Sequence, residues 1–298
     1  MGLKYDLEFL REYPAFLRIV IFLLVLVLLW LPLAAPFYFF ISDRNFVSII
    51  TLILLYIEFI ILIHFWTKLI YREFHPLTRY GLVFNPKNYQ NYLKGLLLGL
   101  FSLMGLFLIE SLFGWVIWQP ANPNFLRIIL EGFLVAFGIG FAEELFFRGW
   151  LLDELKRDSN PKIALGINSI IFASLHFIKP LAEIQRTALQ FPGLVLLGLI
   201  LVISKLAWFP ASSNSLRLSP SGWLGLPMGL HGGLVWGYYI INVGQLINYS
   251  DTVSEAITGI DKNPLAGVMG LFCLSAIGIF IWYKSLFQKL SQSSEFKP

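Results

Sequence analysis

The sequence feature that most constrains the fold is a series of apolar runs of roughly 20 residues or more. Residues 19–42, for example, carry no charged side chain. A hydrocarbon core about 30 Å thick needs about 20 residues of α-helix to cross it, so such runs indicate transmembrane helices. Only 13% of the 298 residues are charged and 57% are hydrophobic, whereas soluble domains are about a quarter charged. The composition therefore excludes soluble enzymes, nucleic-acid-binding proteins and secreted disulfide-rich proteins.

The apolar runs predict an all-α polytopic membrane protein with about eight transmembrane helices and no soluble domain. The first span is expected to remain as an anchor, because it is too long for a cleavable signal. Three regions are expected: 1–125 with three helices and a basic connection, 126–243 as a helical core, and 244–298 with the last helix and tail. The predicted spans lie near residues 16–41, 46–70, 92–118, 126–152, 162–178, 192–209, 221–243 and 264–286.

The distribution of cations predicts how these helices are oriented. Most of the 22 Lys and Arg residues fall in one set of connections, which includes the basic stretch 68–94 and both chain ends. The other set holds only Arg44, Arg127, Lys179, Arg186 and Lys262. Cytoplasmic connections carry the excess of Lys and Arg, so both termini are expected in the cytoplasm. The basic stretch then needs no nucleic-acid partner, and the expected partners are the bilayer and a membrane-associated protein or peptide.

Ionisable residues inside apolar spans are candidates for function, because a charge at mid-bilayer costs about 2.5–3.5 kcal/mol on insertion scales. The densest group is Glu143, Glu144 and Arg148. Glu144 and Arg148 are four residues apart and share a helix face, so they are interpreted as a structural charge pair. Glu143 points about 100° away from Glu144 and is left free for chemistry. Other intramembrane ionisable residues form no such group, and most of them lie close enough to span ends to snorkel: Glu58, His64, Glu110, Glu131 and Lys205.

Glu143 and His176 are predicted to lie at one depth in the membrane. The turn between the fourth and fifth spans falls at 158–161, where Asn160 and Pro161 favour a helix restart. Glu143 and His176 are each about 16 residues from this turn, which is about 24 Å of helix. In an antiparallel hairpin the carboxylate and the imidazole therefore face each other. Phe172 lies one turn before His176 on the same face.

His231, in the seventh span, is the third candidate. Ser219 and Pro220 predict the start of its helix, which places His231 at a depth compatible with the pair. Glycines recur every four residues around it and let another helix approach closely. They are Gly225, Gly229, Gly233 and Gly237.

The residues Glu-Glu-x-x-x-Arg at 143–148, Phe-x-x-x-His at 172–176 and the later His231 resemble the three motifs of the CPBP intramembrane proteases. That family includes the type II CAAX prenyl proteases and bacteriocin-processing, Abi-like relatives. The resemblance covers roughly residues 130–240. It implies an intramembrane metalloprotease-like peptidase in which Glu143, His176 and His231 form the site. One position departs from the pattern, because the family has Asn or Asp four residues after the last histidine and this chain has Val235.

Two mechanisms fit these residues. In the first, Glu143 activates a water, His176 holds it or shares its proton, and His231 donates to the oxyanion. In the second, Glu143, His176 and His231 hold one divalent metal, since two histidines and a carboxylate form a known catalytic zinc arrangement. The sequence leaves both open. Cys273, the only cysteine, excludes a Cys-based zinc site.

The leading functional hypothesis is an endopeptidase that cuts a membrane-associated protein or peptide from the cytoplasmic side. A second hypothesis is a catalytically impaired scaffold that binds and protects a membrane partner, which the loss of the motif residue at Val235 would permit. A third is a transporter with a carboxylate–histidine proton relay, although no internal repeat supports it.

Overall fold

The structure, a computed structural model, describes residues 7–207 and 222–295, with only the backbone over 287–295. It is 79% helical, which confirms the predicted all-α class of a polytopic membrane protein. The elements, in chain order, are η1 (Glu8–Glu12), α1 (Ala15–Phe40), α2 (Arg44–Tyr71), α3 (Pro76–Arg79), α4 (Pro86–Leu112), β1 (Val116–Trp118), α5 (Phe125–Glu144), η2 (Leu145–Leu151), α6 (Leu152–Asp158), α7 (Pro161–Leu175), α8 (Leu181–Thr187), α9 (Gln190–Leu206), α11 (Gly225–Val243), β2 (Ile247–Tyr249), α12 (Glu255–Thr258), η3 (Ile260–Lys262), η4 (Pro264–Ala266) and α13 (Val268–Glu295).

Local sequence signals set several helix starts. Asp43 caps α2, because its side chain accepts hydrogen bonds from the backbone amides of Asn45 and Phe46. Asn160 caps α7 in the same way, and Pro161 occupies its first turn. The predicted turn at 158–161 is therefore present. The predicted cap at Ser219 and Pro220 lies outside the described residues, and α11 begins at Gly225.

The described residues contain five helices that are long and apolar enough to cross a membrane, or six if the bent pair α8–α9 forms one span. The predicted number was about eight. The fifth predicted span became α7, whose 15 residues cover only about 22 Å. The seventh became α11, which is not among the candidate spans. Its first nine residues are all buried. This part of the helix therefore packs against protein and does not face lipid.

The glycine stripe of α11 packs directly on α4, as predicted. A Cβ atom at Gly225 would overlap the Asn88 carbonyl oxygen, and one at Gly229 would overlap the carbonyl oxygen of Tyr92. On another side of α11, a Cβ at Gly140 of α5 would lie 2.8 Å from the carbonyl oxygen of Met228. Helices can come this close only where side chains are absent. The close packing fixes α11 between α4 and α5 and thereby fixes the position of His231.

Gly229→Ala should lower the stability of the bundle by about 1–3 kcal/mol, because the added methyl group must push α4 and α11 apart. The matched control is Gly105→Ala in α4, where nothing lies within 4 Å of the new Cβ. Alanine there should be neutral or stabilising, since it favours helix more than glycine does. Thermal unfolding in detergent measures both. Equal melting temperatures for the two variants would contradict the packing described here.

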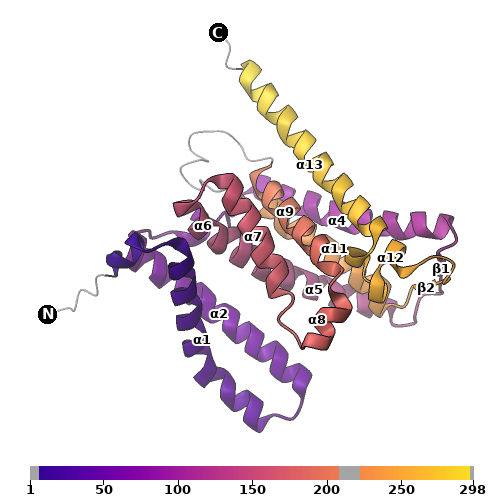
Figure 1. Ribbon diagram of the computed structural model, residues 1–298, viewed down its shortest axis with the longest axis horizontal. Helices are drawn as coiled ribbons and strands as arrows, with labels where there is room; N and C mark the ends of the chain where they lie inside the picture. Colours follow the sequence, from indigo (N-terminus) through magenta and orange to yellow (C-terminus); the bar gives the residue numbers. More distant parts are fainter. Residues whose placement is uncertain (1–6, 208–221, 296–298) are drawn as a thin grey trace.

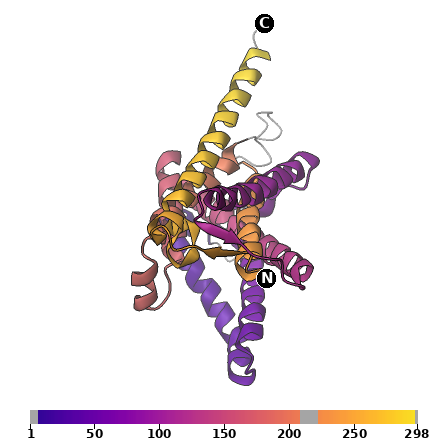
Figure 2. The same ribbon diagram turned by 90° about the vertical axis from the view of Figure 1, so that its right-hand side faces the viewer.

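The helices do not form one parallel stack. Figures 1 and 2 show the α1–α2 hairpin leaving the bundle in one direction and α13 leaving it in roughly the opposite one. A short antiparallel pair joins β1 to β2, with Val116 opposite Tyr249 and Trp118 opposite Ile247. This pair, which the sequence did not predict, ties the segment after α4 to the segment after α11. The ends of these two helices therefore lie together.

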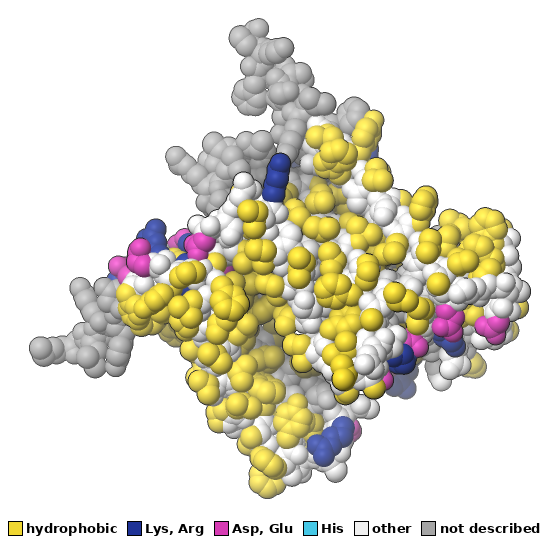
Figure 3. Space-filling model, in the orientation of Figure 1, with side chains coloured by type: hydrophobic (Ala, Val, Ile, Leu, Met, Phe, Trp, Pro, Cys, Tyr) yellow, Lys and Arg dark blue, Asp and Glu magenta, His cyan; other side chains and the backbone are white. Residues whose placement is uncertain are grey.

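The surface is suited to a bilayer. In the view of Figure 3 hydrophobic side chains cover most of the face, and the charged side chains gather near its margins. Large apolar residues of α1 and α2 are strongly exposed, including Phe16 at 76% and Leu52 at 63%. In water such a surface would be costly, whereas lipid accommodates it.

Candidate active site

The structure brings together Glu143 at the end of α5, His176 at the C-cap of α7, and His231 in the first half of α11. The Nε2 atom of His176 lies 3.8 Å from Oε2 of Glu143, and the Nε2 atom of His231 lies 4.0 Å from the same oxygen. This oxygen is buried and has no hydrogen-bond partner among the described residues. Both separations exceed a direct hydrogen bond but leave room for a bridging water. A carboxylate oxygen is thus held between two imidazoles.

The α7 backbone orients His176. Its Nδ1 atom lies 2.8 Å from the carbonyl oxygen of Phe172, one turn earlier. A carbonyl can only accept, so Nδ1 carries the proton that it donates and the Nε2 lone pair faces Glu143. The Phe172 ring is fully buried and packs against the imidazole, with ring centroids 4.5 Å apart. His176 is therefore aimed by the residue one turn before it.

Glu144 orients His231. Its Oε1 atom accepts a hydrogen bond from Arg148 Nη1 at 2.8 Å and lies 2.9 Å from Nδ1 of His231. Glu144 and Arg148 are completely buried, and the His231 side chain is 6% exposed. The carboxylate fixes the Nδ1–H tautomer and turns Nε2 toward Glu143. The pair predicted to be structural therefore also contacts the candidate site.

A π-helical segment, η2, carries Arg148. Its wider i→i+5 turns leave backbone carbonyls to be satisfied from outside the helix. The Phe147 carbonyl accepts from Asn168 of α7 at 2.8 Å, and the Arg148 carbonyl accepts from the Lys205 ammonium of α9. The Arg148 guanidinium lies over the Phe172 ring, 4.2 Å from its centroid. The segment is thus anchored on both sides.

Two of the ionisable residues outside the candidate group are fully buried. Lys205 is 0% exposed and binds the η2 backbone, as described above. Glu110 is also 0% exposed, and neither of its carboxylate oxygens has a hydrogen-bond partner among the described residues. Neither side chain snorkels, because the neighbouring helices cover it. The charge of Lys205 within an apolar span was the only sequence signal of its contact with η2.

A cavity of about 340 Å³ adjoins the three candidate residues and is lined mainly by apolar residues, most often leucine. Glu143 and His176 reach into it with side chains that are 30% and 33% exposed. Val235 lines it one turn after His231, at the position where the resembling family has Asn or Asp. Tyr238 also lines it, but its hydroxyl donates to the Lys262 carbonyl at 3.4 Å rather than to His231.

The three residues have the atom types that bind zinc, but these atoms are farther apart than zinc ligands are. Bonds of about 2.0–2.2 Å in a tetrahedral arrangement place neighbouring ligand atoms roughly 3.4 Å apart. The contacts to Glu143 are 3.8 and 4.0 Å. Over residues 7–207 and 222–295 no group of three His, Cys, Asp or Glu side chains is arranged to hold a metal ion. We therefore derive no step through a metal.

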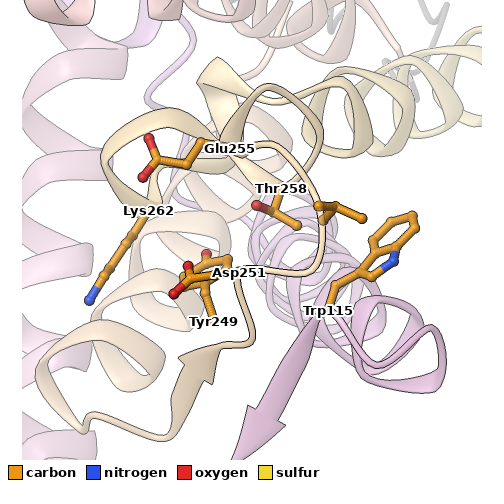
Figure 4. Close-up of a pocket in the computed structure, with 8 residues that line it drawn as sticks. Trp115, Tyr249, Asp251, Glu255, Thr258 and Lys262 are labelled. Carbon is orange, nitrogen blue, oxygen red and sulfur yellow. The ribbon is translucent and has the colours of Figure 1, made fainter.

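A second, smaller cavity of about 60 Å³ lies beside the β1–β2 pair. Figure 4 shows Trp115 on one side of it and Asp251, Glu255 and Lys262 on the other. None of the three candidate residues lines this cavity. Its carboxylates are on exposed residues, as expected for a solvated face.

One comparison with known families matches the region that contains the three candidate residues. Residues 125–248, which include Glu143, His176 and His231, match the family described as Type II CAAX prenyl endopeptidase Rce1-like. This match confirms the resemblance to the CAAX protease family. No curated protein and no solved structure matches the chain.

Proposed function

We propose that this chain is an intramembrane endopeptidase that cleaves a membrane-associated protein or peptide, since its residues 125–248 belong to the Rce1-like type II CAAX prenyl endopeptidase family. The observation that carries the proposal is the buried, unpartnered Glu143 oxygen between the Nε2 atoms of His176 and His231. A carboxylate in this position is suited to act as a general base toward water.

In the proposed reaction a water lies between Glu143 and His176. Glu143 takes a proton from this water while the water oxygen attacks the peptide carbonyl carbon. His231, when protonated, donates a hydrogen bond from Nε2 to the oxyanion that forms. The Glu144 carboxylate stabilises the positive charge of this imidazolium. Glu143 then returns the proton to the leaving nitrogen, the C–N bond breaks, and a carboxylic acid and an amine are released.

The test is cleavage of a membrane-anchored reporter peptide by the purified chain in proteoliposomes, together with metal analysis of the same sample. We expect cleavage that survives prolonged dialysis against a chelator and does not scale with metal content. No cleavage of any peptide in a broad anchored library would contradict the proposed activity. Activity lost on chelation and restored by one metal would instead support the metal-dependent mechanism.

Val235→Asn separates the endopeptidase from the scaffold hypothesis. The amide would enter the cavity one turn after His231 and add a donor near the oxyanion. For a working enzyme we expect measurable cleavage by the wild type and an increase of about 10-fold or more in the variant, since one oxyanion donor is worth about 10²–10³ in rate. The isosteric control is Val235→Thr. A silent wild type that gains activity only as Val235→Asn would favour the scaffold, in which binding of the partner does not need catalysis.

A further inference from the structure

The cavity extends from the candidate site in one direction only. Along α5 its lining includes Ile139, before Glu143, and along α11 it includes Val235 and Tyr238, after His231. From α9 it includes Gln190, the first residue of that helix, and from α4 it includes Leu106, in the last two turns. α4 and α11 run in the same direction, because Gly229 packs on Tyr92 and Gly233 on Leu96, whereas α5 runs opposite to α11. Late positions in α4 and α11 and early positions in α5 and α9 therefore all lie toward the same end of the bundle.

That end can be identified by its contacts, and we call it the strand end, comprising residues 113–124, 178–189 and 244–267. The β1–β2 pair joins the segments that follow α4 and α11. An ion pair between Arg186 and Asp261 joins α8 to η3. A Cβ at Gly193, in the first turn of α9, would overlap the Leu265 carbonyl oxygen. The leucine-lined cavity therefore lies between the candidate site and the strand end.

The opposite end, which we call the basic end, comprises the start of α1, residues 72–85 and the turn 158–161. Buried ion pairs lie beside it. Arg18, 1% exposed, contacts Glu154 at 3.1 Å and Asp158 at 3.1 Å. Glu154 also accepts from the Tyr71 hydroxyl at 2.6 Å. Figure 1 shows α6 beside the N-terminal part of the chain and the strands on the far side of the molecule. Among the described residues, none of these paired groups lines the cavity.

We infer that the site receives its substrate from the strand end, which is the non-cytoplasmic face. Lys and Arg residues gather in the chain around the basic end, in residues 68–94 and 156–162, whereas the strand end holds only Lys179, Arg186 and Lys262. Lys and Arg accumulate on the cytoplasmic side, so the basic end faces the cytoplasm. The access expected from the sequence, from the cytoplasmic side, is thereby reversed. This inference rests on the proposed function, because only a peptidase has a substrate to receive.

The cavity also indicates what kind of segment enters. Its lining is mainly apolar, with leucine the most frequent residue and with Gln190 and Asn263 as polar residues on the way to Glu143. Such a lining favours apolar side chains on both sides of the cleaved bond. The expected substrate is therefore a membrane-anchored polypeptide whose apolar segment is presented at the non-cytoplasmic leaflet.

Single-cysteine labelling tests the inference without using catalysis. In a Cys273→Ser background, which removes the only cysteine, cysteines are placed at Gln190 in the cavity, at Thr252 at the strand end and at Asn160 at the basic end. A membrane-impermeant maleimide is added to intact cells and to inside-out vesicles. We expect Gln190→Cys and Thr252→Cys to react in intact cells, and Asn160→Cys to react in inside-out vesicles alone. The reverse pattern would overturn the inference.

A cleavage experiment then distinguishes the proposed peptidase function from the inferred side of substrate access. Wild-type protein is co-expressed with a reporter whose apolar cleavable segment lies on either the outer or the inner side of its anchor. We expect loss of the outer-facing reporter and no loss of the inner-facing one. Cleavage of the inner-facing reporter alone would overturn the access inference while supporting the peptidase. If neither is cleaved, the proposed function fails, and the labelling pattern still decides which face the cavity opens on.

Discussion

Glu143→Gln should abolish most of the cleavage, by about 10²–10⁴-fold, while the protein stays folded and inserted, because an amide cannot take the proton of the attacking water. The side chain is partly exposed to the cavity, and its Oε2 atom has no hydrogen-bond partner among the described residues. Its replacement therefore breaks no buried hydrogen bond at that atom. Thermal unfolding in detergent should show a melting temperature close to that of the wild type.

The matched control is Glu131→Gln, three turns earlier on α5. Its carboxylate is 44% exposed and pairs with Arg127, far along the helix from the cavity. An exposed i,i+4 pair contributes only about 0.3–0.5 kcal/mol, so this variant should keep both its activity and its stability. Rates are measured at saturating and subsaturating reporter concentrations. Cleavage by Glu143→Gln at the rate of Glu131→Gln would remove Glu143 from the mechanism.

The depth of the site could be predicted from sequence because an α-helix has a fixed rise. Once Asn160 and Pro161 marked the turn, equal spacing placed Glu143 and His176 opposite each other. The structure has them 3.8 Å apart. The glycine stripe around His231 was readable for a related reason, since a repeat of four residues always marks one helix face.

Other features depend on contacts between distant segments and carry no local signal. The β1–β2 pair joins segments more than a hundred residues apart. The π-helical turns of η2 are stabilised by Asn168 and Lys205, which come from other helices. Whether an intramembrane lysine snorkels or turns inward depends on which neighbours cover it. Hydropathy also missed that much of α11 is buried against protein rather than facing lipid.

Glu144 is the residue for which sequence analysis recognised one role and the structure adds a second. It was interpreted as the partner of Arg148, and it also lies 2.9 Å from Nδ1 of His231. Spacing along one helix predicted the first contact. The second contact joins the last residue of α5 to α11, between residues that are 87 positions apart in the sequence. It could be found only from the packed structure.

Glu144→Gln should therefore reduce both stability and activity. The change leaves the fully buried Arg148 guanidinium without its carboxylate, and breaking a buried ion pair costs about 3–5 kcal/mol. His231 loses the group that fixes its tautomer and supports its positive charge, so cleavage should fall as well. Melting temperature in detergent and reporter cleavage measure the two effects separately.

The double variant Glu144→Gln with Arg148→Met distinguishes a positioning role from a purely structural one. Removing both charges relieves the unpaired guanidinium, and replacing a buried ion pair with apolar groups is often neutral or stabilising. Stability should therefore return toward the wild-type value. Cleavage should remain low, because His231 still lacks its carboxylate partner. If activity recovered together with the melting temperature, Glu144 would serve only to neutralise Arg148, and the orientation of His231 would have to come from the packing of α11 against α4 and α5.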